Sequence, residues 1–305
     1  MKLRFLNFGF FVLTFLALPA PPLAAQEVQP ERPLPDVVTL MHEVEEHQKT
    51  SEAIEKDYIY HQVETVQNHG KKTETRESDI FWLNGVQVEK LIRKDGKDLT
   101  ADEQKKENER IDKEVAKAKE RKAKADAKGK ETDANGHDEI TVSRFLMLGS
   151  FTNPRRVQID GRDNIAIDFT GDPKAKTRNR GEDLVKNLAG TLWVDEQDRT
   201  LARVEGRFVN NFKIGAGLVI NIKKDTSFHF SQKKINGEVW LPAHIDGQGA
   251  ARVLLFVNFD GSVQVDDSDY RKFKATSTIL PGVATVKDPA SETAPSQPSE
   301  TSNPQ

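Results

Sequence analysis

Cysteine is absent from the 305 residues of this chain, and its absence removes several classes of function at once. Without thiols there is no disulfide bond, no thiolate nucleophile and no cysteine metal site. Lipid attachment through a cysteine is excluded for the same reason. Tyrosine and tryptophan are scarce, with three of each, so the sixteen phenylalanines supply most of the aromatic area for a core.

A surplus of positive charge is also lacking. Lys and Arg number 45 and Asp and Glu number 48, which leaves a formal net charge of −3. A nucleic-acid-binding protein would show a basic surplus, so we expect no nucleic-acid partner. Basic residues gather at 174–180, but no aromatic side chains alternate with them, and we interpret this stretch as a solvated loop.

Long hydrophobic runs are confined to the N-terminal segment. Lys2 and Arg4 precede the apolar run Phe5–Leu18, and the small residues Ala24–Ala25 close the segment. This order is typical of a secretory signal peptide over residues 1–25. The run is shorter than the roughly twenty residues that a membrane-spanning helix needs. We therefore expect an exported, periplasmic protein, with an uncleaved N-terminal anchor as the alternative.

Residues 26–282 are expected to form a single domain. From 283 to 305 the sequence is rich in Pro, Ser, Thr and Ala. Such a segment has too little apolar area to offset the entropy lost on ordering, so we expect a disordered tail over 283–305.

A charged segment interrupts this domain at about 101–130. It is rich in Lys, Glu, Ala, Asp and Arg, and Ile111 and Val115 are almost its only large apolar residues. This composition predicts a helical insertion without a stripe wide enough to pack firmly, so we expect it to be solvated. The basic part, 117–130, has a second interpretation as a contact with anionic lipid headgroups.

Helical spacing appears at three other places in the domain. Asp36 is a candidate N-cap, and apolar residues follow it at helical spacing to about Ala53. A short buried helix is expected over 138–151, and a brief one over 181–188.

Two-residue periodicity begins at Tyr58 and dominates the remaining sequence. Asn84–Gly85 is the strongest hairpin signal, because a type I′ turn needs positive φ at both central residues. Further turns are expected at 160–161 and 235–237. About ten or eleven antiparallel strands with few helices predict an α+β fold. We expect one large curved sheet, a half-barrel, with helices covering its concave face.

No arrangement of residues indicates catalysis or metal binding. The seven histidines are scattered. His42 and His47 lie five residues apart, about 140° around a helix, so they cannot share an ion as an i, i+4 pair does. Asp266, Asp267 and Asp269 are interpreted as a loop beside the last strand. We therefore expect no cofactor, no metal and no enzyme activity.

Short motifs in the second half carry a family resemblance. Gly190–Asp195 reads Gly-Thr-Leu-Trp-Val-Asp and precedes Leu201–Glu205, and Glu238–Pro242 reads Glu-Val-Trp-Leu-Pro. With the order helix, meander, helix, meander over about Asp36–Thr278, the chain resembles a divergent member of the outer-membrane lipoprotein-sorting (LolA/LolB-like) family. The resemblance implies a curved antiparallel sheet and a helical lid over a hydrophobic cavity that receives acyl chains. The insertion at 101–130 departs from this pattern.

A second observation that bears on function is a predicted strand with apolar side chains on both of its faces. Val253–Phe259 places large apolar residues at consecutive positions, so either protein covers both faces or one face holds an apolar guest. We expect a periplasmic, non-enzymatic carrier for a lipid or lipoprotein acyl chain. The alternative is an envelope protein-interaction or stress-sensing module of the same fold without a small ligand, and peripheral membrane contact is compatible with both. The expected cavity-lining residues are Leu192, Val194, Val204, Leu218, Ile220, Phe228, Phe230, Val253 and Leu255.

Overall fold

The computed structural model describes residues 32–130, 132–137, 139–214, 219–253 and 257–273. All helices and strands described below belong to one unit of the chain, which begins at Leu34. The expected signal peptide and the expected tail lie outside the described residues.

Helices are few and strands are many. The helices are α1 (Val37–Glu55), α2 (Ala101–Asp126), α3 (Val142–Leu146) and α4 (Arg180–Val185). The first strands are β1 (Tyr58–Asn68), β2 (Glu74–Leu83), β3 (Val86–Lys94), β4 (Lys97–Asp98), β5 (Gly149–Ile159) and β6 (Arg162–Gly171). The later strands are β7 (Leu188–Asp195), β8 (Thr200–Phe208), β9 (Phe212–Ile214), β10 (Ile220–Ile222), β11 (Ser227–Ile235), β12 (Val239–Val253) and β13 (Val257–Lys272).

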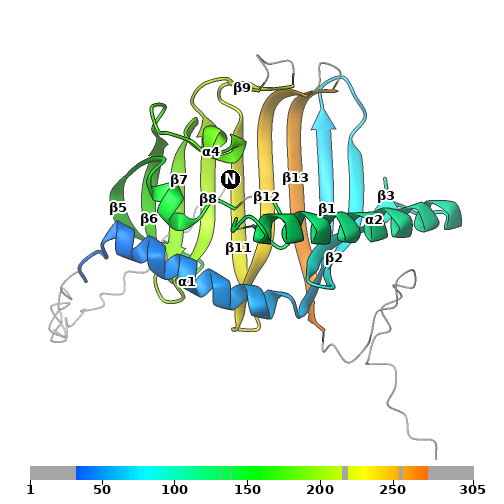
Figure 1. Cartoon of the computed structure of the whole chain (residues 1–305), viewed down its shortest axis with the longest axis horizontal. Coiled ribbons are helices and arrows are strands. Elements are labelled where there is room, and N and C mark those ends of the chain that lie inside the picture. The colour runs from blue at the N-terminus through cyan, green and yellow to red at the C-terminus, as the bar shows by residue number, and fades with distance from the viewer. Residues whose placement is uncertain (1–31, 131, 138, 215–218, 254–256, 274–305) are drawn as a thin grey trace, which may run out of the picture. The chain divides into compact units, whose positions relative to one another are not determined.

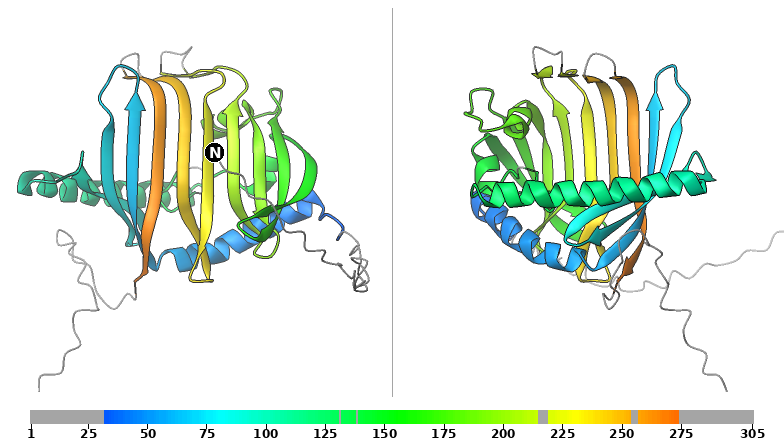
Figure 2. Two further views of the ribbon diagram at one scale, coloured as in Figure 1. Left: turned by 180° about the vertical axis from the view of Figure 1, so that it is seen from behind. Right: turned by 45° about the vertical axis from the view of Figure 1, so that its right-hand side comes forward.

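All these strands form one antiparallel sheet of 13 strands. Its order is β4-β3-β2-β1-β13-β12-β11-β8-β7-β6-β5, and β10 joins β9 to β12 beside this path. The two ends of the order do not pair with each other, and the sheet is open and curved (Figures 1 and 2). The predicted α+β fold with one large curved antiparallel sheet is confirmed.

Turn residues place the hairpins where the sequence predicts them. Asn84 and Gly85 have φ values of 55° and 79°, the two positive values of a type I′ turn, and they join β2 to β3. Asp160 and Gly161, with φ values of 49° and 76°, join β5 to β6 in the same way. These two predicted turns are confirmed, and so is the third, where Asn236 and Gly237 have φ values of 51° and 73° between β11 and β12.

Helix α1 runs obliquely across the lower part of the sheet (Figure 1), and its first half packs against β6, β7 and β8. It begins at the predicted cap, because the Asp36 carboxylate accepts a hydrogen bond from the Thr39 amide at 2.9 Å. Leu40, Met41 and Val44 form its buried side. The strand residues that pack against this side are Ile165, Ile167, Leu192 and Val194. A helix on the concave face is thus confirmed at this end of the sheet.

Helix α2 is the predicted helical insertion and most of its residues are exposed, but one side of it packs against the protein, which the prediction of a solvated segment missed. Ile111, Val115 and Ala118 are buried in a cluster with β1, β2 and β3. Thr100 and Glu103 form a capping box at its first turn. The apolar stripe is narrow, as the composition indicates, and polar contacts supply the rest of the attachment.

Those polar contacts lie along the margin of β3. The Glu107 carboxylate accepts from the Leu91 amide at 2.8 Å, and Arg110 donates to the Glu89 carbonyl at 2.6 Å. Arg110 also binds Glu107 at 2.6 Å, so the two side chains are held together. Backbone groups that an edge strand would leave open are therefore occupied by α2, which runs past this margin in Figure 2.

The other margin of the sheet, β5, is irregular. Its register shifts between Thr152 and Arg155. Asn153 has a φ of 53°, and the next residue, Pro154, has no N–H to donate. A bulge and a proline are both features that interrupt an edge strand.

The short helix expected over 138–151 is shorter in the structure. Only Val142–Leu146 is helical, with Thr141 as its N-cap, and β5 begins at Gly149. A Cβ atom at residue 149 would lie 2.4 Å from the Thr170 carbonyl oxygen, so glycine permits the close pairing that starts the strand. Apolar spacing alone did not reveal this boundary.

Two further boundaries differ from the sequence-based expectation. The helix expected over 181–188 is α4, which ends at Val185. Asp266, Asp267 and Asp269 lie within β13 and not in a loop, and Asp269, with a φ of 51°, sits at an irregularity in the pairing with β1. Among the described residues, no helix is both long enough and apolar enough to cross a membrane.

Candidate functional site

An apolar cavity of about 260 Å³ lies between α1, α3 and the strands β6, β7, β8 and β11. Aliphatic and aromatic side chains make up most of its wall. From the helices and the loop before α3 these are Met41, Val44, Ile140, Val142 and Phe145. From the strands they are Phe169, Leu188, Leu192, Leu201, Val204 and Phe228, and the polar lining residues are Gln48, Thr191 and Glu205.

Strand register places the strand part of this wall on one face. Leu192 lies opposite Val204, and Val204 lies opposite Phe230. Directly opposed residues of antiparallel strands project from the same face of a sheet. Leu192 also belongs to the buried cluster under α1, so this face is the one that α1 covers.

Two glycines beside the cavity allow close approaches that side chains would block. Gly190 and Gly206 lie opposite each other on β7 and β8. A Cβ atom at residue 206 would lie 2.5 Å from the Phe228 ring, and one at residue 190 would lie 1.8 Å from the Glu205 carbonyl oxygen. Without side chains at these two positions, the Phe228 ring lies close over the strand pair and bounds the cavity.

Three phenylalanines pack together beside α3, and two of them, Phe145 and Phe169, line the cavity. The Phe145 ring centroid is 4.9 Å from that of Phe169 and 5.2 Å from that of Phe151. Rings at these separations attract one another beyond the area they bury. The cluster joins α3 to β5 and β6 and closes the cavity on that side.

Helix α3 is fixed by polar contacts on both sides. Arg144 Nη2 lies 2.8 Å from Glu182 Oε2, and Arg144 Nε lies 3.0 Å from Glu182 Oε1. The hydrogen bonds from this guanidinium hold the pKa of Glu182 below its usual value, although burial of the carboxylate acts in the opposite direction. Toward α1, the Val142 amide donates to Glu45 at 3.3 Å. The cover of the cavity is therefore tied to both α4 and α1.

The structure brings part of the predicted site together. Leu192, Val204 and Phe228 line the cavity. Val194 is fully buried in the cluster with α1 and contributes to the core beside it. A ligand-binding role for these residues stays a prediction.

The remaining predicted residues lie elsewhere. Ile220 is part of β10, and Phe230 projects from the cavity face of β11 without lining the cavity. Leu218 and Leu255 lie outside the described residues. The side chain of Val253 does too, although its backbone ends β12.

Sequence reasoning missed the helical half of the wall. Met41 and Val44 stand on the apolar stripe that follows Asp36, and this stripe was the available signal. Phe145 belongs to the helix that the apolar spacing predicted. Both helices were expected to fill the concave face, but spacing along a helix does not show where two helices leave a gap.

The size of the cavity limits what it can hold. Small-molecule sites typically measure ~300–1,000 Å³, and this cavity, at about 260 Å³, is slightly smaller. Its volume suits one flexible apolar chain. Each methylene buried there would contribute ~0.8 kcal/mol without any polar contact.

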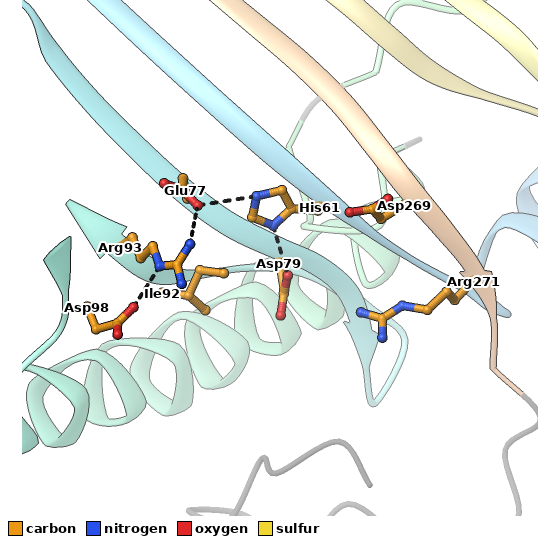
Figure 3. Close-up of a pocket in the computed structure, with 8 residues that line it drawn as sticks. All are labelled: His61, Glu77, Asp79, Ile92, Arg93, Asp98, Asp269 and Arg271. Atoms are coloured by element: carbon orange, nitrogen blue, oxygen red, sulfur yellow. Dashed lines mark hydrogen bonds and ion pairs between the residues drawn. The ribbon is translucent and has the colours of Figure 1, made fainter. Parts of the chain in front are cut away.

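A second pocket, of about 420 Å³, is charged (Figure 3). His61 lies between two carboxylates, with Nε2 3.6 Å from Glu77 Oε2 and Nδ1 3.3 Å from Asp79 Oδ1. Arg93 contacts Glu77 at 3.4 Å and Asp98 at 2.6 Å. The lining residues include no hydroxyl or thiol group that His61 could activate, so we interpret this pocket as an ion-pair cluster.

Comparison with known proteins gives similarities of structure only. No family model matches the chain, and no curated protein matches it. A crystal structure described as an outer membrane lipoprotein-sorting protein domain from Vibrio parahaemolyticus has a TM-score of 0.36 at 11% identity. It covers 78% of this chain and 95% of its own.

Two further solved structures are similar at the same level. A LolA superfamily protein from Nitrosomonas europaea has a TM-score of 0.33 at 11% identity, covering 76% of this chain and 93% of its own. A DUF1329 family protein from Desulfovibrio piger has a TM-score of 0.34 at 12% identity, covering 80% and 96%. The sequence motifs resemble the same lipoprotein-sorting group. Because these TM-scores are below 0.5, the fold is assigned from the strand order and register given above and not from these similarities.

Proposed function

We propose that this chain is an exported, non-enzymatic binding or carrier protein that holds an acyl chain of a lipid or lipoprotein. The cavity between α1, α3 and the sheet carries the proposal, because its wall is almost wholly apolar. The pattern of residues 1–25 supports export.

The energetics of the cavity favour an acyl chain over a polar ligand. A polar group placed there would lose its water and find few partners, at a cost of ~1–3 kcal/mol for each unsatisfied group. A hydrocarbon chain gains free energy from the same wall. Gln48 is the polar side chain on this side of the sheet, because Thr191 and Glu205 alternate with Leu192 and Val204 and project from the other face. A headgroup would therefore lie beside Gln48 or outside the cavity.

Uptake of a fluorescent fatty acid by delipidated protein tests the proposal. We expect saturable binding of one probe molecule per chain, with an increase in probe emission as the probe leaves water. Unlabelled fatty acid should displace the probe. Well-folded protein that takes up no probe would overturn the carrier proposal and favour the interaction module with a filled interior.

A matched pair of variants locates the site. Val204→Trp adds a large side chain to the cavity wall, and we expect it to reduce probe affinity at least tenfold. Val38→Trp places the same residue on α1 at a position that is 51% exposed, and we expect affinity to be unchanged. Circular dichroism should show both variants folded. Equal affinities in the two variants would place any acyl binding outside this cavity.

A further inference from the structure

Two histidines and an aspartate meet on the sheet although they are separate in sequence. His229 is on β11, and His244 and Asp246 are on β12. One ligand atom from each lies within 4.8 Å of the ligand atoms of the other two. Among the described residues, these three side chains form the group of His, Asp or Glu whose ligand atoms lie close enough together to hold one metal ion.

Strand register fixes the group on one face. His229 lies directly opposite Asp246, and His244 stands two positions before Asp246 on the same strand. Side chains two positions apart on a strand share a face. Phe228 and Phe230 flank His229 and therefore project from the other face, so the group lies away from the apolar cavity.

The contacts within the group converge on one carboxylate oxygen. Asp246 Oδ2 lies 2.8 Å from His229 Nδ1 and 3.2 Å from His244 Nε2. On its other side, His244 Nδ1 lies 2.6 Å from Asp266 Oδ1. Asp266 is itself held, because its Oδ2 accepts from Gln264 at 2.7 Å.

This arrangement gives His244 a carboxylate at each ring nitrogen. A neutral imidazole has one N–H, so it can donate to Asp246 or to Asp266 but not to both. With the proton on Nδ1, toward Asp266, the lone pair of Nε2 faces the Asp246 oxygen, and a cation placed between these two atoms can bind both.

We propose that His229, His244 and Asp246 bind a zinc ion and that Asp266 is a positioning residue for His244. Imidazole nitrogen and carboxylate oxygen form a ligand set typical of zinc. A histidine ligand commonly donates its second N–H to a carboxylate, as His244 is placed to do toward Asp266.

The distances suit a tetrahedral ion after small side-chain movements. Zinc binds nitrogen and oxygen at ~2.0–2.2 Å, which places neighbouring ligand atoms roughly 3.3 Å apart. The two contacts to Asp246, at 2.8 and 3.2 Å, are close to this spacing. Because β11, β12 and β13 are paired strands in the middle of the sheet (Figure 1), their backbones hold the ligands in place.

Solvent can reach the group and complete the coordination. The side chains of His229, His244 and Asp246 are 22%, 31% and 48% exposed. His229 and Asp246 also line a groove of about 610 Å³ on the sheet. A water molecule in this groove would be the fourth ligand.

Zinc titration of untagged, chelator-treated full-length protein tests this proposal. We expect isothermal titration calorimetry with zinc chloride to show one bound ion per chain, which excess Mg²⁺ does not displace. His244→Gln and Asp246→Asn should each weaken zinc binding at least tenfold. Asp266→Asn should weaken it ~10–100-fold, the usual effect of losing a carboxylate behind a histidine ligand.

The matched control is His61→Gln. His61 also contacts two carboxylates, but no second histidine lines its pocket, so zinc binding should be unchanged in this variant. An NMR spectrum of the histidine rings in the unsubstituted protein gives a test that needs no variant. Zinc should shift the ring signals of His229 and His244 and leave those of His61 in place.

Absence of stoichiometric binding would overturn the proposal, and so would equal affinities in the unsubstituted protein and His244→Gln. The acyl-chain proposal is unaffected by either result, because the two sites lie on opposite faces and use different probes.

Discussion

The two ends of the sheet are covered in different ways. At the β6–β8 end, α1 and the short helix α3 meet over the strands through apolar side chains, and a cavity remains between them. At the β1–β3 end, the single long helix α2 follows the β3 margin. The pocket at that end is charged and its side chains pair with one another.

The difference shows where this fold leaves room for an apolar ligand. Helices α1 and α3 come from separate parts of the chain, and each contacts the sheet and the other helix. The space between these contacts is left unfilled. Helix α2 packs alone on its end of the sheet, so no space between two helices arises there. Substitutions at the first end should therefore change stability and acyl uptake together, whereas substitutions at the second end should change stability alone.

The largest effect is expected at the first end. Leu40 is 0% exposed and packs α1 onto the strands, so Leu40→Ala should lower the free energy of unfolding by ~3 kcal/mol through lost burial and a new void. Urea denaturation followed by tryptophan fluorescence measures this. Acyl uptake should fall as well, because Met41 and Val44 of the same helix line the cavity. A loss below ~1 kcal/mol would show that α1 is not a principal part of the core.

A smaller effect is expected at the second end. Ile111 is 5% exposed and is one of few apolar contacts of α2, so Ile111→Ala should cost ~2 kcal/mol. Probe affinity should equal that of the unsubstituted protein. If uptake falls as much as in Leu40→Ala, the two ends are coupled and the comparison fails.

The buried carboxylate of Asp267, on β13 beside β1, should make the free energy of unfolding depend on pH. Burial raises the pKa of Asp267 to about 6 from 3.8, and its Oδ2 has no hydrogen-bond partner among the described residues. Between these values the folded state holds the proton more tightly than the unfolded state, so this residue makes stability fall as pH rises from about 4 to about 6.

Asp267→Asn removes this dependence. We expect a gain on the order of 1 kcal/mol above pH 6 and no gain below pH 4, since the carboxyl group is neutral there in both states. The Asn side chain can still accept the hydrogen bond from Gln62, which is 3.0 Å long in the structure. Urea midpoints at pH 4 and pH 7 measure the difference, and equal gains at both pH values would contradict it.

The smallest effect is expected on the exposed side of α2. Glu120 and Lys124 form an ion pair at 2.6 Å, but their side chains are 63% and 69% exposed. Water and salt screen such pairs, so Glu120→Gln should leave the urea midpoint unchanged within error. A clear loss would mean that surface charge, and not Ile111 with its neighbours, holds this helix.

The features of the fold that were predicted correctly are those that depend on residues close together in the sequence. The Asp36 cap and the Asn84–Gly85 turn depend on side chains and φ values within a few residues, and both are confirmed. The packing of α2 depends on which backbone groups of β3 lack a strand partner, and that information is not local. The cavity is harder still to predict, because it is a gap between elements and no residue pattern marks a gap.

The proposed zinc site shows a further limit of prediction from sequence. The turn at Asn236–Gly237 sets Ile235 opposite Val239, and an uninterrupted hairpin would then place His229 opposite Ile245. The observed pairing shifts by one residue between Ser231 and Gln232, which brings Asp246 opposite His229. A single-residue shift changes which side chains share a face. The position of this bulge could not be read from residue types.

The two interrupted margins of the sheet have a consequence for how this protein meets other molecules. Side chains of α2 occupy backbone groups along β3, and a proline and a bulge interrupt β5. Neither of these two borders offers an incoming peptide a continuous ladder of hydrogen bonds, so copies of the chain should not join sheet to sheet there. A protein that associates at either border would have to recognise side chains, so a single-residue substitution there should weaken the association.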